Sequence, residues 1–169
     1  RGMGGGDFAW SPDQKWIAYS ARSESRAWNI FIVPSEGGAP VNVTQLYAEH
    51  SEPAWSPDGK YLFFQSTREG SGLYVLPLKP EPVRSSDTDI KYEKPGTNLT
   101  VEIDFTDISR RIRRFSSQSP QSDLHVASDG SVMFLSEGDI WSVTYDGKDT
   151  KRLTTGGGKT ALRLARDAK

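Results

Sequence analysis

A stretch of seven residues occurs twice in this chain, almost unchanged and 45 positions apart. It reads AWSPDQK at residues 9–15 and AWSPDGK at residues 54–60. A fainter third copy covers residues 127–156, and residues 162–169 align with the beginning of a fourth copy. A fixed period of about 40 to 45 residues is typical of repeat folds, in which each copy is one small unit that packs on its neighbours.

Each copy contains a tight turn that is followed by short apolar runs. In such a turn proline presets φ, aspartate bonds nearby backbone, and glycine accepts a positive φ. Gln14 stands where Gly59 stands in the second copy, so we expect it to keep the left-handed conformation at a small cost. The residues predicted to form the turns are Ser11, Pro12, Asp13, Ser56, Pro57, Asp58, Gly59, Asp129 and Gly130.

The run after each turn is apolar without alternation, as in residues 61–64, and a strand of this kind needs cover on both faces. Four short strands per copy, sandwiched between neighbouring copies, describe the blades of a β-propeller. We therefore predict an all-β fold of four-stranded antiparallel blades. The aromatic residues predicted to pack between blades are Trp10, Trp55, Trp16, Tyr61 and Trp141.

The chain supplies a partial propeller, because closed propellers need roughly four to eight blades. Blade 1 is expected at about 7–46, blade 2 at about 51–117, blade 3 at about 122–155, and the first strand of a fourth blade at about 160–169. Apolar blade faces at the two ends then need a cover. We expect the cover to be the remainder of a longer parent propeller or another copy of the chain.

Residues 79–98 interrupt the period and are rich in proline, serine and charge, which predicts a mobile insertion in blade 2. After it, Val101, Ile103 and Phe105 alternate as a strand does, and residues 110–116 fall where the fourth strand of the next copy falls. The alternative for this region is a helix, with Ile108, Ile112 and Phe115 on one face.

The repeats resemble the WD-like propeller repeats of TolB and of tricorn-type proteases. The stretch IDFTDISRRI at residues 103–112, together with the preceding insertion and the third copy, is similar to the later propeller region of tricorn-like serine peptidases. That resemblance implies a noncatalytic scaffold, gate or channel for peptide substrates, in a parent that carries its serine peptidase region further along the chain. The alternative is a TolB-like propeller that binds proteins and has no attached enzyme.

The residue inventory argues against catalysis within this segment. The two histidines are the only imidazole bases, no GxSxG elbow frames a serine, and there is no cysteine. We predict no catalytic residues and no cofactor here, and whether the parent is an enzyme stays open. The net charge of −1 and the absence of aromatic residues among Arg110, Arg111, Arg113 and Arg114 speak against nucleic-acid binding. These arginines are expected to protect an outer strand edge.

Residues just before an innermost strand face the channel of a propeller or its mouth. The candidates for contacts with a peptide or protein ligand are Asp7, Glu49, His50 and Glu52. Asp7 and Glu52 are one period apart, so acidic groups recur around the channel and favour the basic groups or amino terminus of a peptide. A short acidic loop without further ligands is more often solvated surface, so no metal is predicted.

His125 lies in a strand that enters a blade, and we expect it to be packed or hydrogen-bonded. No apolar run approaches the roughly 18 residues that a membrane span needs. The sequence leaves the compartment, periplasmic or cytoplasmic, undecided.

Overall fold

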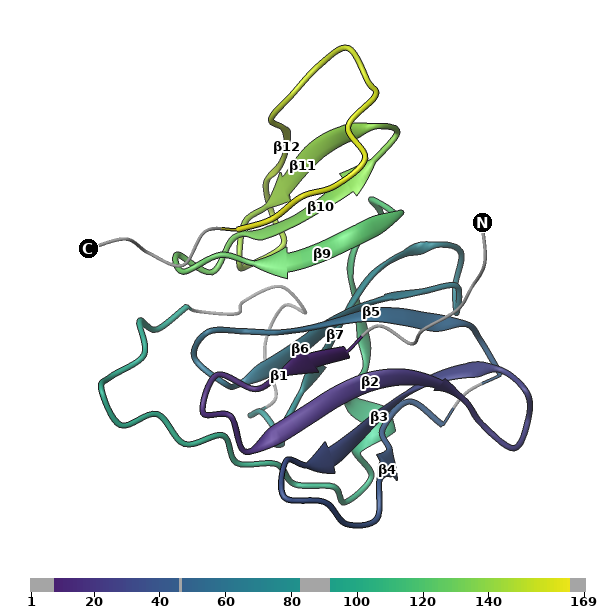
Figure 1. The fold of residues 1–169 in the computed structure, drawn as a ribbon, viewed down its shortest axis with the longest axis vertical. Coiled ribbons are helices and arrows are strands. Elements are labelled where there is room, and N and C mark those ends of the chain that lie inside the picture. Colours follow the sequence, from purple (N-terminus) through teal and green to yellow (C-terminus); the bar gives the residue numbers. More distant parts are fainter. Residues whose placement is uncertain (1–7, 46, 83–91, 165–169) are drawn as a thin grey trace.

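Three four-stranded antiparallel sheets make up the fold in the computed structural model, which describes residues 8–45, 47–82 and 92–164. The strands of each sheet lie side by side in chain order (Figure 1). Blade 1 consists of β1 (Phe8–Trp10), β2 (Trp16–Arg22), β3 (Trp28–Pro34) and β4 (Val41–Asn42). Blade 2 consists of β5 (His50–Trp55), β6 (Tyr61–Ser66), β7 (Gly72–Pro77) and β8 (Arg113–Ser116). Blade 3 consists of β9 (Ser122–Val126), β10 (Val132–Ser136), β11 (Asp139–Val143) and β12 (Thr150–Arg152). The predicted all-β architecture of four-stranded blades is confirmed.

The hydrophobic core lies between the blades rather than within one of them. Blade 2 contributes to both apolar clusters because its central strands are buried on both faces. On one face, Leu62 and Phe64 pack with Ala18, Ile30 and Ile32 of blade 1. On the other face, blade 2 packs against blade 3 through a second set, which includes Phe63, Val75, Val132, Phe134 and Val143. This double burial explains why residues 61–64 show no alternation of polarity.

The turns of the first two copies have the backbone that the sequence demands. Gln14 takes a φ of 62° and Gly59 a φ of 67°, so glutamine does keep the left-handed conformation. In the second copy the Ser56 Oγ hydroxyl donates to Asp58 Oδ1 at 2.6 Å, and Ser56 Oγ accepts from the Tyr61 amide at 2.9 Å. These bonds hold the hairpin between β5 and β6, and Ser11 and Asp13 repeat the hydroxyl to carboxylate bond in blade 1 at 2.6 Å.

The connection from β7 to β8 departs from the expectation of a strand at residues 101–105. No strand forms there, and a short 3-10 helix, η1 (Ile108–Arg111), follows. The Val101 amide donates to Asp13 Oδ2 at 2.8 Å and the Asp104 amide to the Leu78 carbonyl at 2.9 Å. Val101 and its alternating neighbours therefore cover the apolar cluster between blades 1 and 2 instead of pairing with a strand.

Parts of the predicted insertion pack on the blades. Residues 83–91 lie outside the described residues, and the mobility of residues 79–98 stays a prediction. Glu81 accepts from the Tyr61 hydroxyl and from Arg113 Nη1, and Tyr92 stacks edge-on against Tyr145 with ring centroids 5.0 Å apart. Both ends of the insertion are therefore attached to blades 2 and 3.

The segment expected to begin a fourth blade is described only as far as residue 164. No strand is assigned in residues 156–164. The Leu162 amide donates to Asp123 Oδ2 at 3.2 Å, and the Leu162 carbonyl lies 3.1 Å from His125 Nε2. The chain after blade 3 thus returns to the first strand of that blade, which is where the first strand of a following blade belongs.

Candidate functional site

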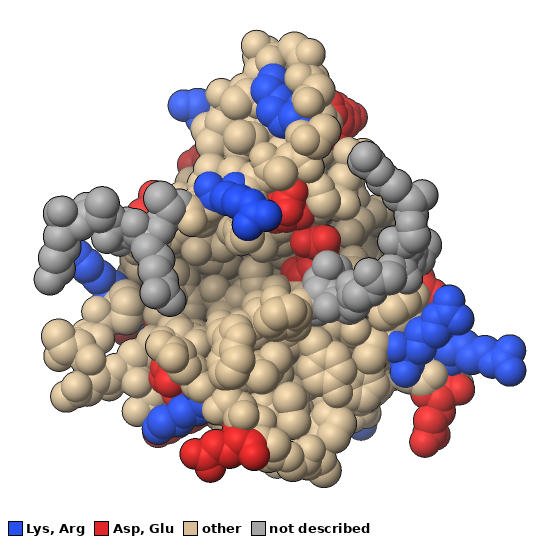
Figure 2. Space-filling view, viewed as in Figure 1, with Lys and Arg blue, Asp and Glu red and all other residues tan. Residues whose placement is uncertain are grey.

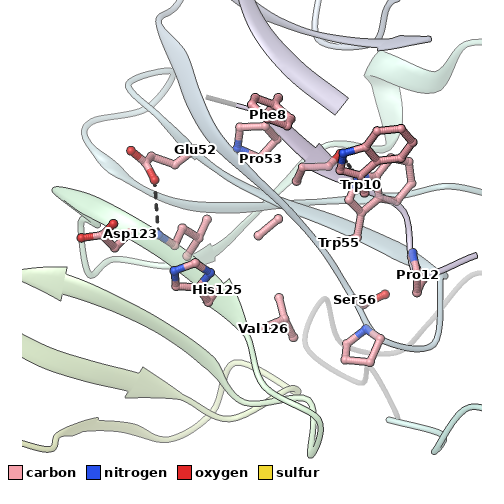
Figure 3. A pocket seen from close by; sticks show the side chains of 14 residues that line it. Phe8, Trp10, Pro12, Glu52, Pro53, Trp55, Ser56, Asp123, His125 and Val126 are labelled. Atoms are coloured by element: carbon pink, nitrogen blue, oxygen red, sulfur yellow. Dashed lines mark hydrogen bonds between the residues drawn. The ribbon is translucent and has the colours of Figure 1, made fainter. Parts of the chain in front are cut away.

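The first strands of the three blades lie next to one another, with β5 between β1 and β9 (Figure 1). They border an open cavity of about 670 Å³. In the space-filling view the surface is hollowed between blade 3 and the other two blades, and most of it there is uncharged (Figure 2). The cavity is lined by Phe8, Ala9, Trp10, Pro12, Glu52, Pro53, Ala54, Trp55, Ser56, Pro57, Asp123, Leu124, His125 and Val126 (Figure 3).

Two acidic residues occupy equivalent irregular positions in this wall. Glu52 and Asp123 have φ values of 55° and 54°, and each lies at a register shift in the pairing of its strand. A left-handed conformation costs a residue with a side chain roughly 1 kcal/mol. The bulge turns each carboxylate toward the next part of the chain.

Each of these carboxylates accepts a backbone hydrogen bond from the segment that follows its blade. Glu52 Oε2 accepts from the Leu124 amide of blade 3 at 3.3 Å (Figure 3). Asp123 Oδ2 accepts from the Leu162 amide at 3.2 Å. The repeat aligns Glu52 with Asp123, and the donor Leu124 is the residue after Asp123. It aligns Asp123 with residue 161, and the donor Leu162 is again the next residue. The acidic residues of the inner wall therefore join neighbouring first strands.

The same bond is impossible between blades 1 and 2. Asp7 lies outside the described residues, and the donor position that the repeat assigns to its carboxylate is Pro53, which has no amide hydrogen. Trp55 supplies a different link, because its indole Nε1 donates to the Ala9 carbonyl at 3.0 Å. The sequence predicted that acidic groups recur around the channel but not that they join neighbouring strands. That role depends on where the amides of the next blade lie.

Replacing Glu52 by alanine is expected to lower the free energy of unfolding by about 1 kcal/mol, because the Leu124 amide loses its acceptor. Glu52→Gln keeps an oxygen at that place and is expected to cost less. Hydrogen exchange followed by NMR measures the effect where it arises, as faster exchange of the Leu124 amide in Glu52→Ala. Unchanged protection of that amide in both variants would contradict the assignment.

Glu49 and His50, the other candidates for ligand contacts near Glu52, make their contacts elsewhere. Glu49 Oε2 accepts from the Trp28 amide at 3.1 Å, which joins blade 2 to the β2–β3 hairpin of blade 1. His50 is fully buried, and neither ring nitrogen has a hydrogen-bond partner. Burial, with a smaller contribution from the Arg68 charge, lowers the pKa of His50 to about 4. Among the described residues no group of three acidic, histidine or cysteine side chains is arranged to hold a metal ion.

Four of the five aromatic residues predicted to pack between blades lie at such contacts. Trp55 and Trp16 pack in the cluster between blades 1 and 2, and Tyr61 and Trp141 pack in the cluster between blades 2 and 3. Trp10 belongs to neither cluster, and 51% of its surface is exposed. Its packing against another blade stays a prediction.

The turn aspartates also receive donors from neighbouring blades. The Tyr145 hydroxyl of blade 3 lies 2.9 Å and 2.8 Å from the two oxygens of the buried Asp58 carboxylate. Burial and the negative charge of Asp58 raise the pKa of the Tyr145 hydroxyl, so it stays a donor. Asp129 is exposed and bonds within its own turn, where Oδ1 accepts from the Ser131 amide at 2.9 Å. Sequence reasoning missed Tyr145, because the burial of Asp58, which requires a donor, is known only from the structure.

The arginine-rich stretch is largely engaged within the protein. Arg113 pairs with Glu81 at 2.7 Å, and both side chains are mostly buried. Arg114 donates to the carbonyls of Glu69 and Ser71, and Arg111 to those of Asp104 and Thr106. Three of the four guanidinium groups therefore hold β8 and the segment before it in place.

Two curated proteins are similar to part of the chain. One is "Uncharacterized peptidase YuxL" of Bacillus subtilis (strain 168), which is 37% identical over 99 residues, 56% of this chain and 15% of that protein. The other is a protein of Sulfurisphaera tokodaii that carries the name Tricorn-like protease C-terminal subunit, 34% identical over 59 residues, 35% of this chain and 7% of that protein. The chain thus spans less than a fifth of the length of these relatives. No protein-family model matches it.

Solved structures extend the likeness over most of the chain. TolB from Acinetobacter baumannii superposes with a TM-score of 0.64 and 22% identity, over 90% of this chain and 33% of that one. The tricorn protease superposes with a TM-score of 0.61 and 17% identity, over 86% of this chain and 18% of that one. No helix in the described residues is both long and apolar enough to cross a bilayer. The chain has the fold of β-propeller blades like those of TolB and the tricorn protease, and it resembles a peptidase and a tricorn-like protease in sequence.

Proposed function

We propose that this chain is a noncatalytic propeller segment of a tricorn-like serine peptidase and that it receives peptide substrates at the cavity between β1, β5 and β9. The observation that carries the proposal is the cavity itself, which is walled by the first strands of all three blades. In a propeller these strands border the central channel. The sequence likeness to a peptidase and to a tricorn-like protease subunit supports the peptide as ligand class.

The cavity has the chemistry to receive an extended peptide. Pro53, Ala54 and Val126 offer apolar surface, and Glu52 and Asp123 contribute two carboxylates. Apolar walls of low dielectric constant focus the field of such charges. A peptide that enters with its protonated amino terminus first is therefore favoured over one whose amino terminus is neutral.

The test uses the purified chain and synthetic decapeptides of mixed sequence, each made with a free and with an acetylated amino terminus. We expect the free form to bind more tightly in tryptophan fluorescence titrations, with the difference shrinking as salt screens the carboxylates. Mass spectrometry of the same mixtures is expected to show intact peptides. Cleavage would contradict the noncatalytic role, and equal binding of the two forms would contradict the role of the carboxylates.

A TolB-like protein-binding scaffold is the second candidate. The superposition on TolB, which covers 90% of this chain, favours it. In that case the decapeptides leave the tryptophan fluorescence unchanged, and a folded protein partner is retained by the immobilised chain. A Val126→Arg variant, which places a bulky cation in the cavity wall, separates the two functions, because it blocks peptide entry and leaves the outer strands of the blades unchanged.

A further inference from the structure

We infer that the face of blade 1 turned away from blade 2 is a docking surface for a further propeller blade that presents small and branched aliphatic side chains. This surface, the leading face of blade 1, is defined by Trp10, Ile17, Tyr19, Phe31 and Val33. The strand pairings place these side chains on one side of the sheet, with Trp10 opposite Ile17, Ile17 opposite Val33, and Tyr19 opposite Phe31. The inference does not rest on the proposed function.

Blade 2 shows what such a face does. Its residues at the same register positions are Trp55, Leu62, Phe64, Tyr74 and Leu76, with Trp55 opposite Leu62, Leu62 opposite Leu76, and Phe64 opposite Tyr74. All five are buried in the cluster between blades 1 and 2. The leading face of blade 2 is therefore a blade-docking face, and blade 1 carries the same five positions with apolar residues at each.

The aromatic geometry repeats as well. Phe64 and Tyr74 stack with ring centroids 6.2 Å apart and an interplanar angle of 25°. Tyr19 and Phe31 stack at 5.7 Å and 19°. The first pair is buried against blade 1, whereas the second is only partly buried. Blade 1 thus holds its aromatic pair in the docking arrangement before anything covers it.

Aromatic side chains on and beside this face are far more exposed than the corresponding Trp55 of blade 2. Trp10 is 51% exposed, whereas its counterpart Trp55 is 7% exposed. Phe8, in the row with Tyr19 and Phe31, is 66% exposed. Clustered exposed aromatic residues of this kind mark interaction surfaces.

The opposite face of blade 1, on which blade 2 docks, shows which side chains a partner of the leading face should present. Blade 2 docks there on Ala18, Ile30 and Ile32, and the Trp55 indole donates to the Ala9 carbonyl. A partner for the leading face of blade 1 therefore presents aliphatic side chains together with a strand carbonyl within reach of the Trp10 indole. The face of a propeller blade such as blade 1 combines the two in this register.

A second copy of this chain is the less suitable occupant. Its available blade face would be that of blade 3, on the side turned away from blade 2. Leu162 already bonds there, through its backbone, to Asp123 and to His125. The place that β1 of a second copy would take is therefore filled by the chain itself.

The test is a tandem variant in which residues 5–49, one full period, are repeated, so that a copy of blade 1 precedes blade 1. The added blade presents Ala18, Ile30 and Ile32 to the original Trp10. The protein is labelled with 5-fluorotryptophan, and the ¹⁹F signal of the original Trp10 is assigned with Trp10→Phe. We expect a soluble nitroxide to broaden the signal of this Trp10 strongly in the 169-residue chain, and no more than the signal of Trp55 in the tandem variant.

A matched tandem carries Ile32→Ser in the added copy alone, and protection of Trp10 is expected to decrease in it. Hydrogen exchange of the strands of the added blade establishes that this blade is folded. A folded added blade beside a freely accessible Trp10 overturns the inference. Protection of Trp10 in the 169-residue chain that rises with protein concentration, with a dimer in sedimentation, also overturns it, because the occupant is then a second copy.

Discussion

Replacing Phe63 by alanine is expected to lower the free energy of unfolding by about 3–5 kcal/mol. Phe63 is fully buried between blades 2 and 3, and its ring meets the rings of Phe115 and Tyr145 at centroid distances of 5.0 Å and 6.0 Å. Truncation removes the apolar contacts and leaves a cavity that close-packed neighbours fill only in part. Urea unfolding followed by circular dichroism measures the change.

The matched control is Phe8→Ala, the same chemical change at an exposed position of β1. Phe8 is 66% exposed, so its truncation is expected to change the free energy of unfolding by no more than about 0.5 kcal/mol. Equal losses in the two variants would contradict a core that lies between the blades. A loss confined to Phe63→Ala supports it.

Acidification is expected to destabilise the fold through His50. The pKa of this imidazole is about 4 in the folded chain against an ordinary value of 6.5, because burial disfavours the charged ring. Above pH 6.5 the ring is neutral in both states and stability is unaffected. Between pH 6.5 and 4 the unfolded chain binds a proton that the folded chain does not, so stability falls as pH falls, by about 3 kcal/mol in all.

The variant His50→Leu removes the titrating group and its two unpartnered nitrogens. We expect its unfolding free energy between pH 6.5 and 4 to fall by about 3 kcal/mol less than that of the parent chain. His125→Gln, at the only other histidine, is the control and is expected to keep the His50 contribution. Parallel curves for the parent chain and His50→Leu across this range would show that His50 is not the group responsible.

The blades, the strands buried on both faces and the turn conformations could be predicted from the sequence. The 45-residue period predicted the blades, and the apolar run at residues 61–64 predicted strands covered on both faces. Gln14 kept the left-handed φ that its alignment with Gly59 demanded. These predictions succeed because turn chemistry and strand burial depend on residues that are close in sequence.

The misinterpreted segment shows where such reasoning stops. Val101, Ile103 and Phe105 have the alternation of a strand, yet residues 101–105 pair with no strand. Alternation reports only that one side of an extended segment is buried, and the surface that buries it here is the cluster between blades 1 and 2. The sequence carries no local signal that separates the two outcomes.

The repeat, the turns and the blade architecture were determined by the sequence alone, because each follows from a pattern within one period. Only the tertiary structure decided what the acidic residues do. Glu52 meets an amide 72 residues away, Asp58 a hydroxyl 87 residues away and Asp13 an amide 88 residues away. Such partners are brought together by the stacking of blades, so each of these carboxylates also links neighbouring blades.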